Sequence, residues 1–551
     1  MRLVERRIGL LFAAFFLCFS IVLARTMWLQ GVRGGALASQ ASYQQTEMVT
    51  VPGLRGRVLD RRGLELAVSE DAASVFATPF QVKDPGRTAA RLAPLLDVPE
   101  DDLLKELSSQ SGFVYLARKV RMPAAARIER MEIAGIGMHP DSRRSYPQGS
   151  LAAQVLGAVG SENQGLSGLE AGEESVLGGV DGEERLVKDA LGEPISLDTI
   201  RPASDGHDIQ TTIDAALQTR TEEVLAAVGS AYSAKGAAAV IMDPRTSKIL
   251  AMANWPAVDL RDLDQTDPRD LDNQATAFTY EPGSTFKAFT VAAALEDKVV
   301  TPETSFYLPP TIKVADRVIE EAHARPGGDF DVSTILAQSS NVGAVTIGLK
   351  LGAERFSEWV DRFGFGHLTG VQFPAEELGL VPSYEEYSGS SIGNLPLGQG
   401  LSVTPIQMMA AYAAIANGGV MRQPQLIERI DGEPVEEPPG HRVIKPWVAA
   451  EVRQMLEGVL AAGGTAEEVS VPGYTLAGKT GTAQVAENGG YSETKFVASF
   501  MGFAPAHNPG LLVSVIVDQP KGEEYSGGAV AAPAFGEIAA FALPYLGVAP
   551  N

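Results

Sequence analysis

The sequence predicts a mixed α/β (α+β) protein in which one N-terminal membrane helix precedes two exported domains. Three observations predict this organisation. The apolar run Ile8–Ala24 carries no charge and has the length of a short membrane span. In the second half of the chain, strand patterns are followed by helical patterns and then by strand patterns again, which is typical of a sheet with helices on its faces. At 551 residues with 45% hydrophobic composition, the remainder of the chain is long enough to fill at least two cores.

The apolar run is predicted to remain as an anchor. Arg2, Arg6 and Arg7 precede it, and positive residues before a span keep the first residues in the cytoplasm, so the chain after the span is exported. A cleaved signal peptide ending near Ala24 is the alternative, but the 17 uncharged residues exceed the usual apolar core of about 7 to 15. We therefore expect residues 1–24 to be a cytoplasmic tail and a single-pass anchor in the cytoplasmic (inner) membrane, with the rest on the extracytoplasmic or periplasmic side.

Composition suggests three further parts. Residues 25–48 are predicted to be a juxtamembrane stalk, because Gly31–Ser42 is rich in Gly, Ala and Ser. Residues 49–204 mix short strand-like runs with a helical stretch at Thr88–Leu107 and are predicted to form an elongated domain. A turn-rich segment then opens the last domain, residues 205–551.

The last domain begins with alternating element patterns. Ile209–Ile213 is predicted to be a strand and Ala215–Val228 a helix. The runs Ala237–Met242 and Lys248–Ala253 flank a four-residue turn, which indicates a hairpin. Near the end, Leu511–Val517 is apolar throughout but far too short to span a membrane, so we expect a buried strand.

Charge and composition exclude several classes of function. A net charge of −23 argues against nucleic acid and anionic membrane surfaces as partners. The single cysteine, Cys18, lies inside the apolar run, so the exported domains need no disulfide and offer no thiol chemistry. The six histidines show no metal-ligand spacing. We expect no metal and no cofactor.

A nucleophile with an adjacent base is predicted at Ser284-Thr285-Phe286-Lys287. A Pro-Gly turn precedes it and an apolar helical stretch comes after it, so Ser284 should lie in the first turn of a helix. Residues three apart on a helix share a face, and a buried lysine can accept the proton of a serine hydroxyl. An ordinary helix start with a solvated lysine is the alternative.

Two further motifs strengthen this interpretation. Ser339-Ser340-Asn341 comes 55 positions after Ser284 and is predicted to present a hydroxyl and an amide toward a cleft, from a loop or helix start; a plain N-cap is compatible with this. A further 140 positions on, Lys479-Thr480-Gly481-Thr482 lies in a predicted strand. A peptide substrate could bind along that strand by strand addition.

Two other patterns overlap these regions and favour different chemistry. The run from Gly473 to Thr480 fits the phosphate-loop pattern, but the turn at Asn488-Gly489-Gly490 predicts a hairpin where that loop requires a helix. The pattern Gly389-x-Ser391-x-Gly393 fits the nucleophile elbow of esterases, but the required strand and helix are missing around it. We interpret it as a loop.

The three ordered motifs resemble those of class B penicillin-binding proteins, most closely the cell-division peptidoglycan D,D-transpeptidases of the FtsI type. The resemblance runs almost end to end. It includes non-catalytic strings before the last domain: Arg55-Gly56-Arg57-Val58-Leu59-Asp60-Arg61-Arg62-Gly63, Arg144-Ser145-Tyr146-Pro147 and Gly165-Leu166-Ser167-Gly168-Leu169-Glu170. It implies a penicillin-binding/β-lactamase-like transpeptidase domain with an antiparallel sheet flanked by helices, preceded by a non-catalytic pedestal domain of the dimerisation type.

The resemblance also implies a set of site residues. These are catalytic Ser284, Lys287, Ser339, Asn341 and Lys479, and substrate-binding Thr480, Gly481 and Thr482. The implied reaction is acylation of the serine by a D-alanyl-D-alanine stem peptide, release of D-alanine, and attack by the amine of a neighbouring peptide. In it Ser284 attacks, Lys287 takes its proton, Ser339 relays a proton to the leaving amine and Asn341 holds a substrate amide.

The implied partners are peptidoglycan stem peptides and β-lactams, together with an FtsW-type membrane glycosyltransferase and other membrane proteins of the divisome at the septum. Several alternatives remain. A β-lactamase or a D,D-carboxypeptidase shares the three motifs, and carboxypeptidase side activity is compatible with them. A non-enzymatic penicillin-binding scaffold or sensor would not need an activated serine. An elongation-type sister enzyme would perform the same chemistry elsewhere in the cell.

Overall fold

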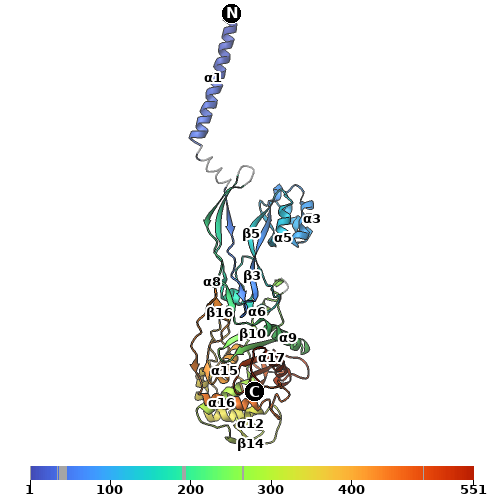
Figure 1. Ribbon diagram of the computed structural model, residues 1–551, viewed down its shortest axis with the longest axis vertical. Coiled ribbons are helices and arrows are strands. Elements are labelled where there is room, and N and C mark those ends of the chain that lie inside the picture. The colour runs from blue at the N-terminus through green and yellow to red at the C-terminus, as the bar shows by residue number, and fades with distance from the viewer. Residues whose placement is uncertain are drawn as a thin grey trace. The chain divides into compact units, whose positions relative to one another are not determined.

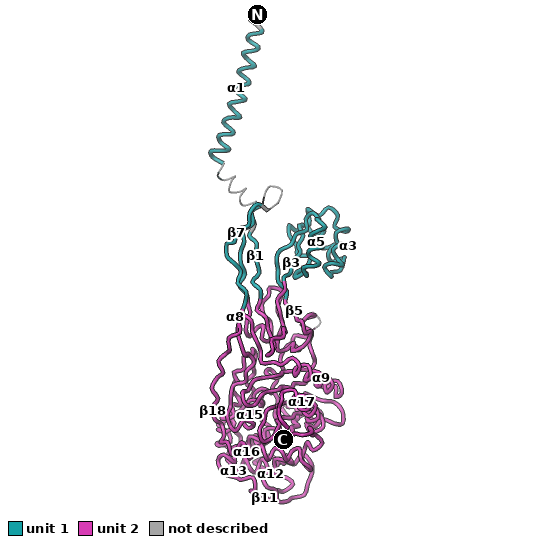
Figure 2. Tube along the Cα trace, viewed as in Figure 1, with its two compact units in different colours: residues 1–54, 71–143, 179–206 teal, residues 55–70, 144–178, 207–551 magenta. Residues whose placement is uncertain are grey.

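The computed structural model describes residues 2–33, 35, 46–188, 194–263, 266–487 and 489–550. The chain divides into two compact units, shown in Figure 2. The first unit comprises residues 1–54, 71–143 and 179–206, and the second comprises residues 55–70, 144–178 and 207–551. The predicted boundary after residue 204 lies close to residue 206, where the chain passes from the first unit to the second for the last time. By their contacts, residues 55–70 and 144–178, which fall within the predicted elongated domain, group with the second unit.

The chain opens with the long helix α1 (Arg2–Gly31), which continues past Ala24 into the predicted stalk. Its segment Val4–Gly31 is apolar enough to span a membrane and is not buried against any described part of the chain. A second helix, Gly527–Tyr545, passes the same test of length and composition, but 56% of it is buried inside the protein, as in a core helix. Residues 34 and 36–45 of the predicted stalk lie outside the described residues.

The first unit contains a three-stranded antiparallel sheet and a small helical subdomain. The sheet has the order β1 (Thr46–Val51), β6 (Gly182–Lys188), β7 (Pro194–Arg201). In the subdomain, the end of β3 (Glu65–Ala77) pairs with β4 (Val114–Arg121).

The helices of this subdomain correct one prediction. Thr88–Leu107 is not a single helix but two, α3 (Pro85–Leu96) and α4 (Glu100–Leu107). Asp97 ends the first helix in the left-handed conformation, with φ +56°, and Pro99 is the N-cap of the second. Because the residue before a proline is disfavoured in helical conformation, the break follows from local sterics.

The second unit is built on a five-stranded antiparallel sheet. Its order is β10 (Lys248–Trp255), β9 (Gly236–Asp243), β21 (Leu511–Asp518), β20 (Gly490–Ala504), β19 (Ala477–Glu487). The predicted hairpin of β9 and β10 is confirmed. Every residue of β21 is buried, as expected for a strand covered on both faces.

Two pairs of helices cover this sheet. Helices α9 (Ala215–Ala231) and α17 (Ala532–Tyr545) pack on each other and on the sheet, and lie side by side in Figure 1. Helices α15 (Pro405–Ala416) and α16 (Pro446–Glu457) form the other pair. The predicted helix Ala215–Val228 is therefore confirmed, and the strand before it is β8 (Ile209–Thr211).

A further helical layer contains the predicted site. Helix α11 (Lys287–Glu296) packs against α12 (Val332–Ala337), α13 (Asn341–Leu351) and α16. Nearly all of α11 is buried, and its small residues Ala292–Ala294 allow neighbouring helices to approach closely.

The remaining elements are short. In the second unit, β8 pairs in parallel with β2 (Val58–Leu59) and antiparallel with β16 (Ile427–Ile430). In the first unit lie α5 (Met122–Glu129) and most of β5 (Ile136–Ser145). The second unit also contains α6 (Ala153–Leu156), α7 (Gly168–Gly172), α8 (Glu174–Leu177), α10 (Gln274–Ala277), β11 (Ser305–Leu308), β12 (Thr311–Val314), β13 (Arg317–Glu320), β14 (Gly328–Asp331), α14 (Ala353–Arg362), β15 (Val420–Met421), β17 (Glu433–Pro434) and β18 (His441–Arg442).

Candidate active site

Ser284 lies in a single 3-10 turn, η4 (Gly283–Phe286), which leads directly into α11 at Lys287. The turn begins at Gly283, which has φ +53° and donates its N–H to the carbonyl oxygen of Gly398 at 3.0 Å. Ser284 is half-buried on the wall of a cavity of about 500 Å³. The predicted helix start is therefore present, with the serine one turn before the α-helix itself.

Lys287 is buried, with an exposed fraction of 1%. Its Nζ donates to the carbonyl oxygen of Ser339 at 2.6 Å and to Oδ1 of Asn341 at 2.7 Å, and lies 3.3 Å from Oγ of Ser339. Burial lowers the pKa of Lys287 to about 7, although the charge of Glu321 acts in the opposite direction. A large share of this amine can therefore be neutral near pH 7, as a proton acceptor must be.

The motif Ser339-Ser340-Asn341 forms the turn into α13. Ser340 is the N-cap, and its Oγ accepts a hydrogen bond from the N–H of Gly343 at 2.9 Å. Ser339 is in the left-handed conformation with φ +60°, which is strained for a residue with a side chain. Asn341 opens the helix, and its Nδ2 donates to the carbonyl oxygen of Glu320 at 2.8 Å. Ser340 is therefore the predicted N-cap, while Ser339 and Asn341 line the cavity as predicted for a cleft.

The third motif lies on β19, the last strand of the five-stranded sheet, which packs next to η4. Lys479 is fully buried and donates to the carbonyl oxygen of Thr480 at 3.2 Å. Burial, together with the nearby charge of Lys287, lowers the pKa of Lys479 well below its usual range. Oγ1 of Thr482 accepts from the N–H of Gly527 at 3.0 Å. Because β19 is an edge strand, its backbone groups can pair with an extended peptide.

Residues of all three motifs line the same cavity. Its walls include Ser284, Ser339, Asn341, Thr480 and Thr482. Lys287 reaches the same place through its bonds to Ser339 and Asn341. Gly481 lies in β19 between the two threonines, where an added Cβ would meet Oγ of Ser499 at 2.4 Å. The site thus brings together segments that are far apart in the chain.

The two competing patterns are resolved by the same elements. Residues 477–487 form a strand that pairs with β20, so the phosphate-loop pattern opens no helix and the predicted hairpin is confirmed. Ser391 lies in a 3-10 turn, Ser391–Gly393, and its Oγ accepts from the N–H of Ser388 at 2.9 Å. Neither pattern forms the site that it would require.

Sequence reasoning missed several residues of this cavity. Glu321, Arg325, Thr465 and Ser526 all line it. Oγ1 of Thr465 lies 2.6 Å from Oγ1 of Thr480. These residues belong to loops without a recognisable pattern, so no local signal could have identified them.

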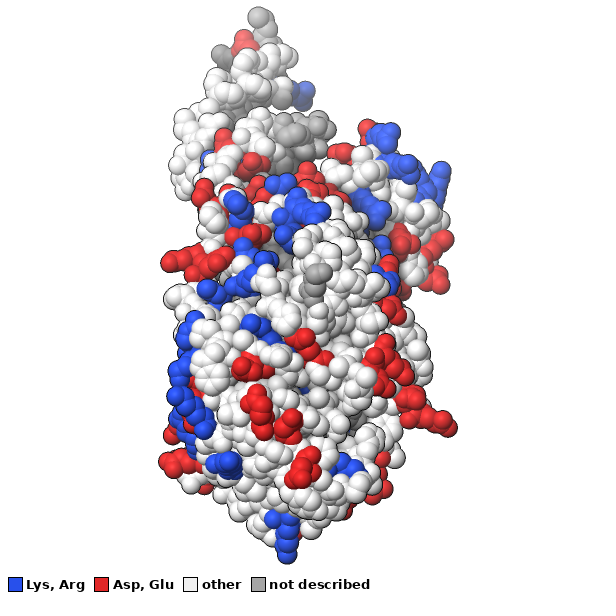
Figure 3. All heavy atoms as spheres, turned by 60° about the horizontal axis from the view of Figure 1, so that its bottom comes forward, with Lys and Arg blue, Asp and Glu red and all other residues white. Residues whose placement is uncertain are grey.

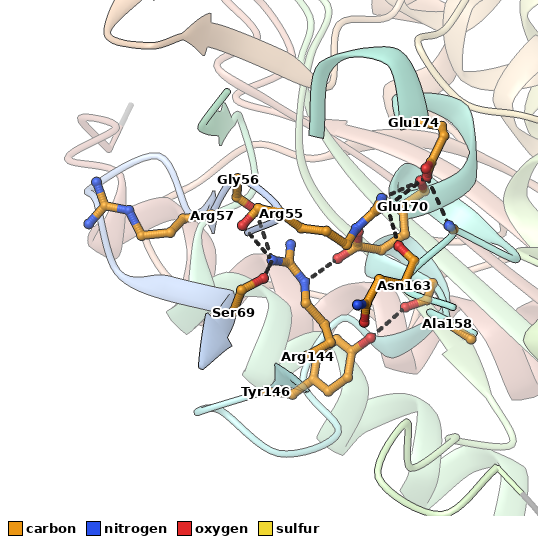
Figure 4. Close-up of polar contacts among 12 residues, drawn as sticks. Arg55, Gly56, Arg57, Ser69, Arg144, Tyr146, Ala158, Asn163, Glu170 and Glu174 are labelled. Atoms are coloured by element: carbon orange, nitrogen blue, oxygen red, sulfur yellow. Dashed lines mark hydrogen bonds and ion pairs between the residues drawn. The ribbon is translucent and has the colours of Figure 1, made fainter. Parts of the chain in front are cut away.

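The predicted non-catalytic strings meet in a buried cluster of the second unit. Figure 4 shows Arg55 and Arg144 approaching Glu170. Nε of Arg55 donates to Glu170 at 2.9 Å, and Nε of Arg144 does so at 2.7 Å. Arg55 also pairs with Glu174 at 2.7 Å, and Arg144 donates to the carbonyl oxygen of Gly56 at 2.8 Å. One carboxylate therefore ties three separate segments of the chain together.

Charged side chains of both signs occur together on one face of the protein. On the face drawn in Figure 3, Asp and Glu side chains are scattered among Lys and Arg side chains.

The site combines three features: a serine three residues before a buried lysine, a Ser-x-Asn turn, and an edge strand with a second buried lysine. This combination defines a serine acyltransferase of the penicillin-interacting class. Comparisons with known proteins agree with this class. Residues 237–540 match the family of the penicillin binding protein transpeptidase domain, and residues 50–211 match the penicillin-binding protein dimerisation domain. The chain therefore belongs to the class B penicillin-binding proteins.

Individual relatives cover almost the full length. The chain is 35% identical over 558 residues to stage V sporulation protein D of Bacillus subtilis (strain 168), covering 98% of this chain and 86% of the relative. It is 31% identical over 552 residues to peptidoglycan D,D-transpeptidase FtsI of Escherichia coli (strain K12), covering 99% and 92%. Among solved structures, penicillin binding protein 3 of Mycobacterium tuberculosis, complexed with aztreonam, is similar with a TM-score of 0.72 at 28% identity, covering 91% of this chain and 98% of that chain.

Proposed function

We propose that this protein is a peptidoglycan D,D-transpeptidase of septal wall synthesis that works through an acyl-enzyme on Ser284. The observation that carries the chemistry is the buried Lys287, which comes three residues after Ser284 and whose amine is held by Ser339 and Asn341. A buried amine with a pKa of about 7 can accept a proton at neutral pH.

The first half-reaction forms an ester. Oγ of Ser284 attacks the carbonyl carbon of the penultimate D-alanine, and its proton passes to the neutral amine of Lys287. The carbon–nitrogen bond then breaks, and the leaving amine of D-alanine takes a proton through the hydroxyl of Ser339. In the second half-reaction an acceptor amine attacks the ester carbonyl and loses a proton to the same groups. The carbon–oxygen bond to Ser284 breaks, and Lys287 returns a proton to Oγ of Ser284.

The developing oxyanion requires hydrogen-bond donors. We assign this role to the backbone N–H groups of Ser284 and Thr482, which lie on η4 and the adjoining strand β19. One such donor typically changes the rate by about 10² to 10³.

The substrate's terminal carboxylate would bind at the third motif. Burial and the nearby Lys287 lower the pKa of Lys479, so an entering carboxylate would offset the cost of a charge on the Lys479 amine. The hydroxyls of Thr480 and Thr482 line the cavity beside them. A β-lactam carries a carboxylate and a reactive carbonyl and would acylate the same serine.

For its place in the cell, we propose a single-pass anchor with the catalytic domain on the extracytoplasmic side. The arginines before the apolar segment of α1 support that orientation. Near-complete coverage of the Escherichia coli FtsI chain supports a division role. The partners would be an FtsW-type membrane glycosyltransferase and other divisome membrane proteins.

Two experiments test the proposal. Labelling the full-length protein with a fluorescent penicillin, followed by peptide mapping, should place the label on Ser284; a label elsewhere would refute the mechanism. Depleting the protein in its own cells should give filaments with unfinished septa, and a fluorescent fusion should collect at midcell. Round, swollen cells with a dispersed side-wall signal would assign the protein to elongation instead.

A further inference from the structure

Glu321 is a buried acidic residue on the wall of the catalytic cavity. It lies in the segment between β13 and β14, and its side chain has an exposed fraction of 4%. One carboxylate oxygen accepts from Oγ of Ser340 at 2.6 Å, and the other accepts from the backbone N–H of Asn341 at 2.6 Å. Nη2 of Arg325 completes the set at 2.5 Å.

The carboxylate of Glu321 therefore binds two consecutive residues of the second motif, the side chain of Ser340 and the backbone of Asn341. Ser339, immediately before, is in the strained left-handed conformation, which persists only where surrounding contacts hold it. Ser339 and Asn341 are also the residues that accept the hydrogen bonds of Lys287. A chain of direct contacts therefore runs from Glu321 through the turn to the base.

Glu321 also contributes charge. Charged groups near Lys287 lie on two elements: Lys479 on β19, and Glu321, which is paired with Arg325, on the segment after β13. Arg325 stacks over the ring of Phe330 at 4.0 Å and partly balances the carboxylate. Glu321 is the neighbouring group that favours the protonated amine of Lys287, whereas burial opposes it.

We propose that Glu321 is a positioning residue of the acylation reaction, which holds the Ser339-Ser340-Asn341 turn against Lys287 and sets the pH range in which Lys287 acts as a base. This rests on the function proposed above. Both effects reach the reacting atoms through Lys287, and Glu321 itself touches no substrate atom in this assignment.

The two effects separate in two substitutions. Glu321→Gln keeps the length of the side chain and removes the charge. Glu321→Asp keeps the charge and shortens its reach to the turn. Asp316→Asn is the matched control, because Asp316 is exposed on the turn before β13 and its removal changes the net charge equally.

The measurement is the second-order rate constant of acylation by a fluorescent penicillin from about pH 5 to 9, using the full-length protein. For Glu321→Gln, the rise of the rate with pH should move to lower pH by about half a unit or more, since the charge that favours protonated Lys287 is gone. Its plateau should fall about 10-fold or more, because an amide cannot accept all three donors. Glu321→Asp should lower the plateau while the rise stays in place, and Asp316→Asn should match the unaltered protein.

Three results would overturn this proposal: a plateau that falls in Glu321→Gln without any shift of the rise, the same profile for both Glu321 variants, or no change in either. The melting temperature of each variant shows whether it is folded. The pH at which the acylation rate rises does not depend on the fraction of protein that is active, so it can be compared between variants. Mapping of the label in the unaltered protein is a separate readout. If Ser284 were not labelled there, the proposed function would fail, whatever the Glu321 variants show.

Discussion

Nζ of Lys287 donates a 2.7 Å hydrogen bond to Oδ1 of Asn341, a residue 54 positions further along the chain. The lysine and the serine before it belong to one helical start, whereas the asparagine opens a different helix, α13. The base of the proposed reaction is therefore oriented by the second motif. Its position and its protonation both depend on how α11 and α13 pack.

Ser284→Ala should abolish covalent labelling by a fluorescent penicillin, because the substitution removes the oxygen that forms the acyl ester in our assignment. Gel fluorescence of the purified protein measures this. Ser391→Ala is the control, since that serine belongs to the rejected esterase pattern and should label normally. Labelling that persists in Ser284→Ala would contradict the assignment.

Lys287→Met should slow acylation by about 10² to 10⁴, the usual contribution of a positioned general base. Methionine fills the volume of the lysine stem, so the fold should be retained and the melting temperature should not drop sharply. Stopped-flow acylation kinetics measure the rate. Kinetics equal to those of the unaltered protein would exclude Lys287 as the base.

The acylation rate of the unaltered protein should rise with pH through about 7. Only the neutral amine of Lys287 can accept the proton of Ser284, and burial lowers the pKa of Lys287 to about 7. The base is therefore lost as pH falls below that value. A pH series of acylation rates measures this. A rate that stays flat down to pH 5, or that only begins to rise near pH 10, would contradict a buried basic lysine.

Gly398→Ala should impair acylation strongly. Gly398 has φ +79°, and an added Cβ would lie 2.2 Å from the carbonyl oxygen of Gly283, so the turn that carries Ser284 would have to move. Gly432→Ala is a matched control, because Gly432 has φ +80° but an added Cβ there meets nothing within 4 Å. Acylation rates and melting temperatures of both variants are measured, because backbone strain alone should affect the two alike. Equal loss of acylation in Gly398→Ala and Gly432→Ala would refute the steric argument.

Glu170→Gln should destabilise the second unit by about 3 kcal/mol or more, because it leaves the buried guanidinium groups of Arg55 and Arg144 without their shared counter-charge. Thermal unfolding should show a clearly lower midpoint. Glu174→Gln is the comparison, since its carboxylate is 47% exposed and its loss should cost much less. Similar midpoints for both variants would show that the buried network does not stabilise the fold.

Much of the site could be predicted from the sequence because its parts are local. The hydroxyl of Ser284 and the amine of Lys287 are brought to one turn by spacing alone. The strand that carries Lys479 was predicted from the extended run Tyr474–Val485, and the turn after it indicated a hairpin. The break between α3 and α4 was missed because helical periodicity on both sides outweighed the signal of Pro99.

Other features could not be predicted. Glu321 and Thr465 lie on loops, where residue identity says little about which distant group the side chain meets. The interleaving of the two units along the chain is equally hidden, since residues 55–70 and 144–178 belong with residues far later in the chain.

The sequence by itself determined which chemical groups are present and which of them are neighbours along a helix or strand, because backbone geometry sets those distances. Only the tertiary structure decided that Lys287 and Lys479 are both buried, that Ser339 and Asn341 accept hydrogen bonds from Lys287, and that Glu321 ties their turn in place. The physical reason is desolvation: the pKa of an amine depends on every segment that excludes water from it, and those segments are distant in sequence.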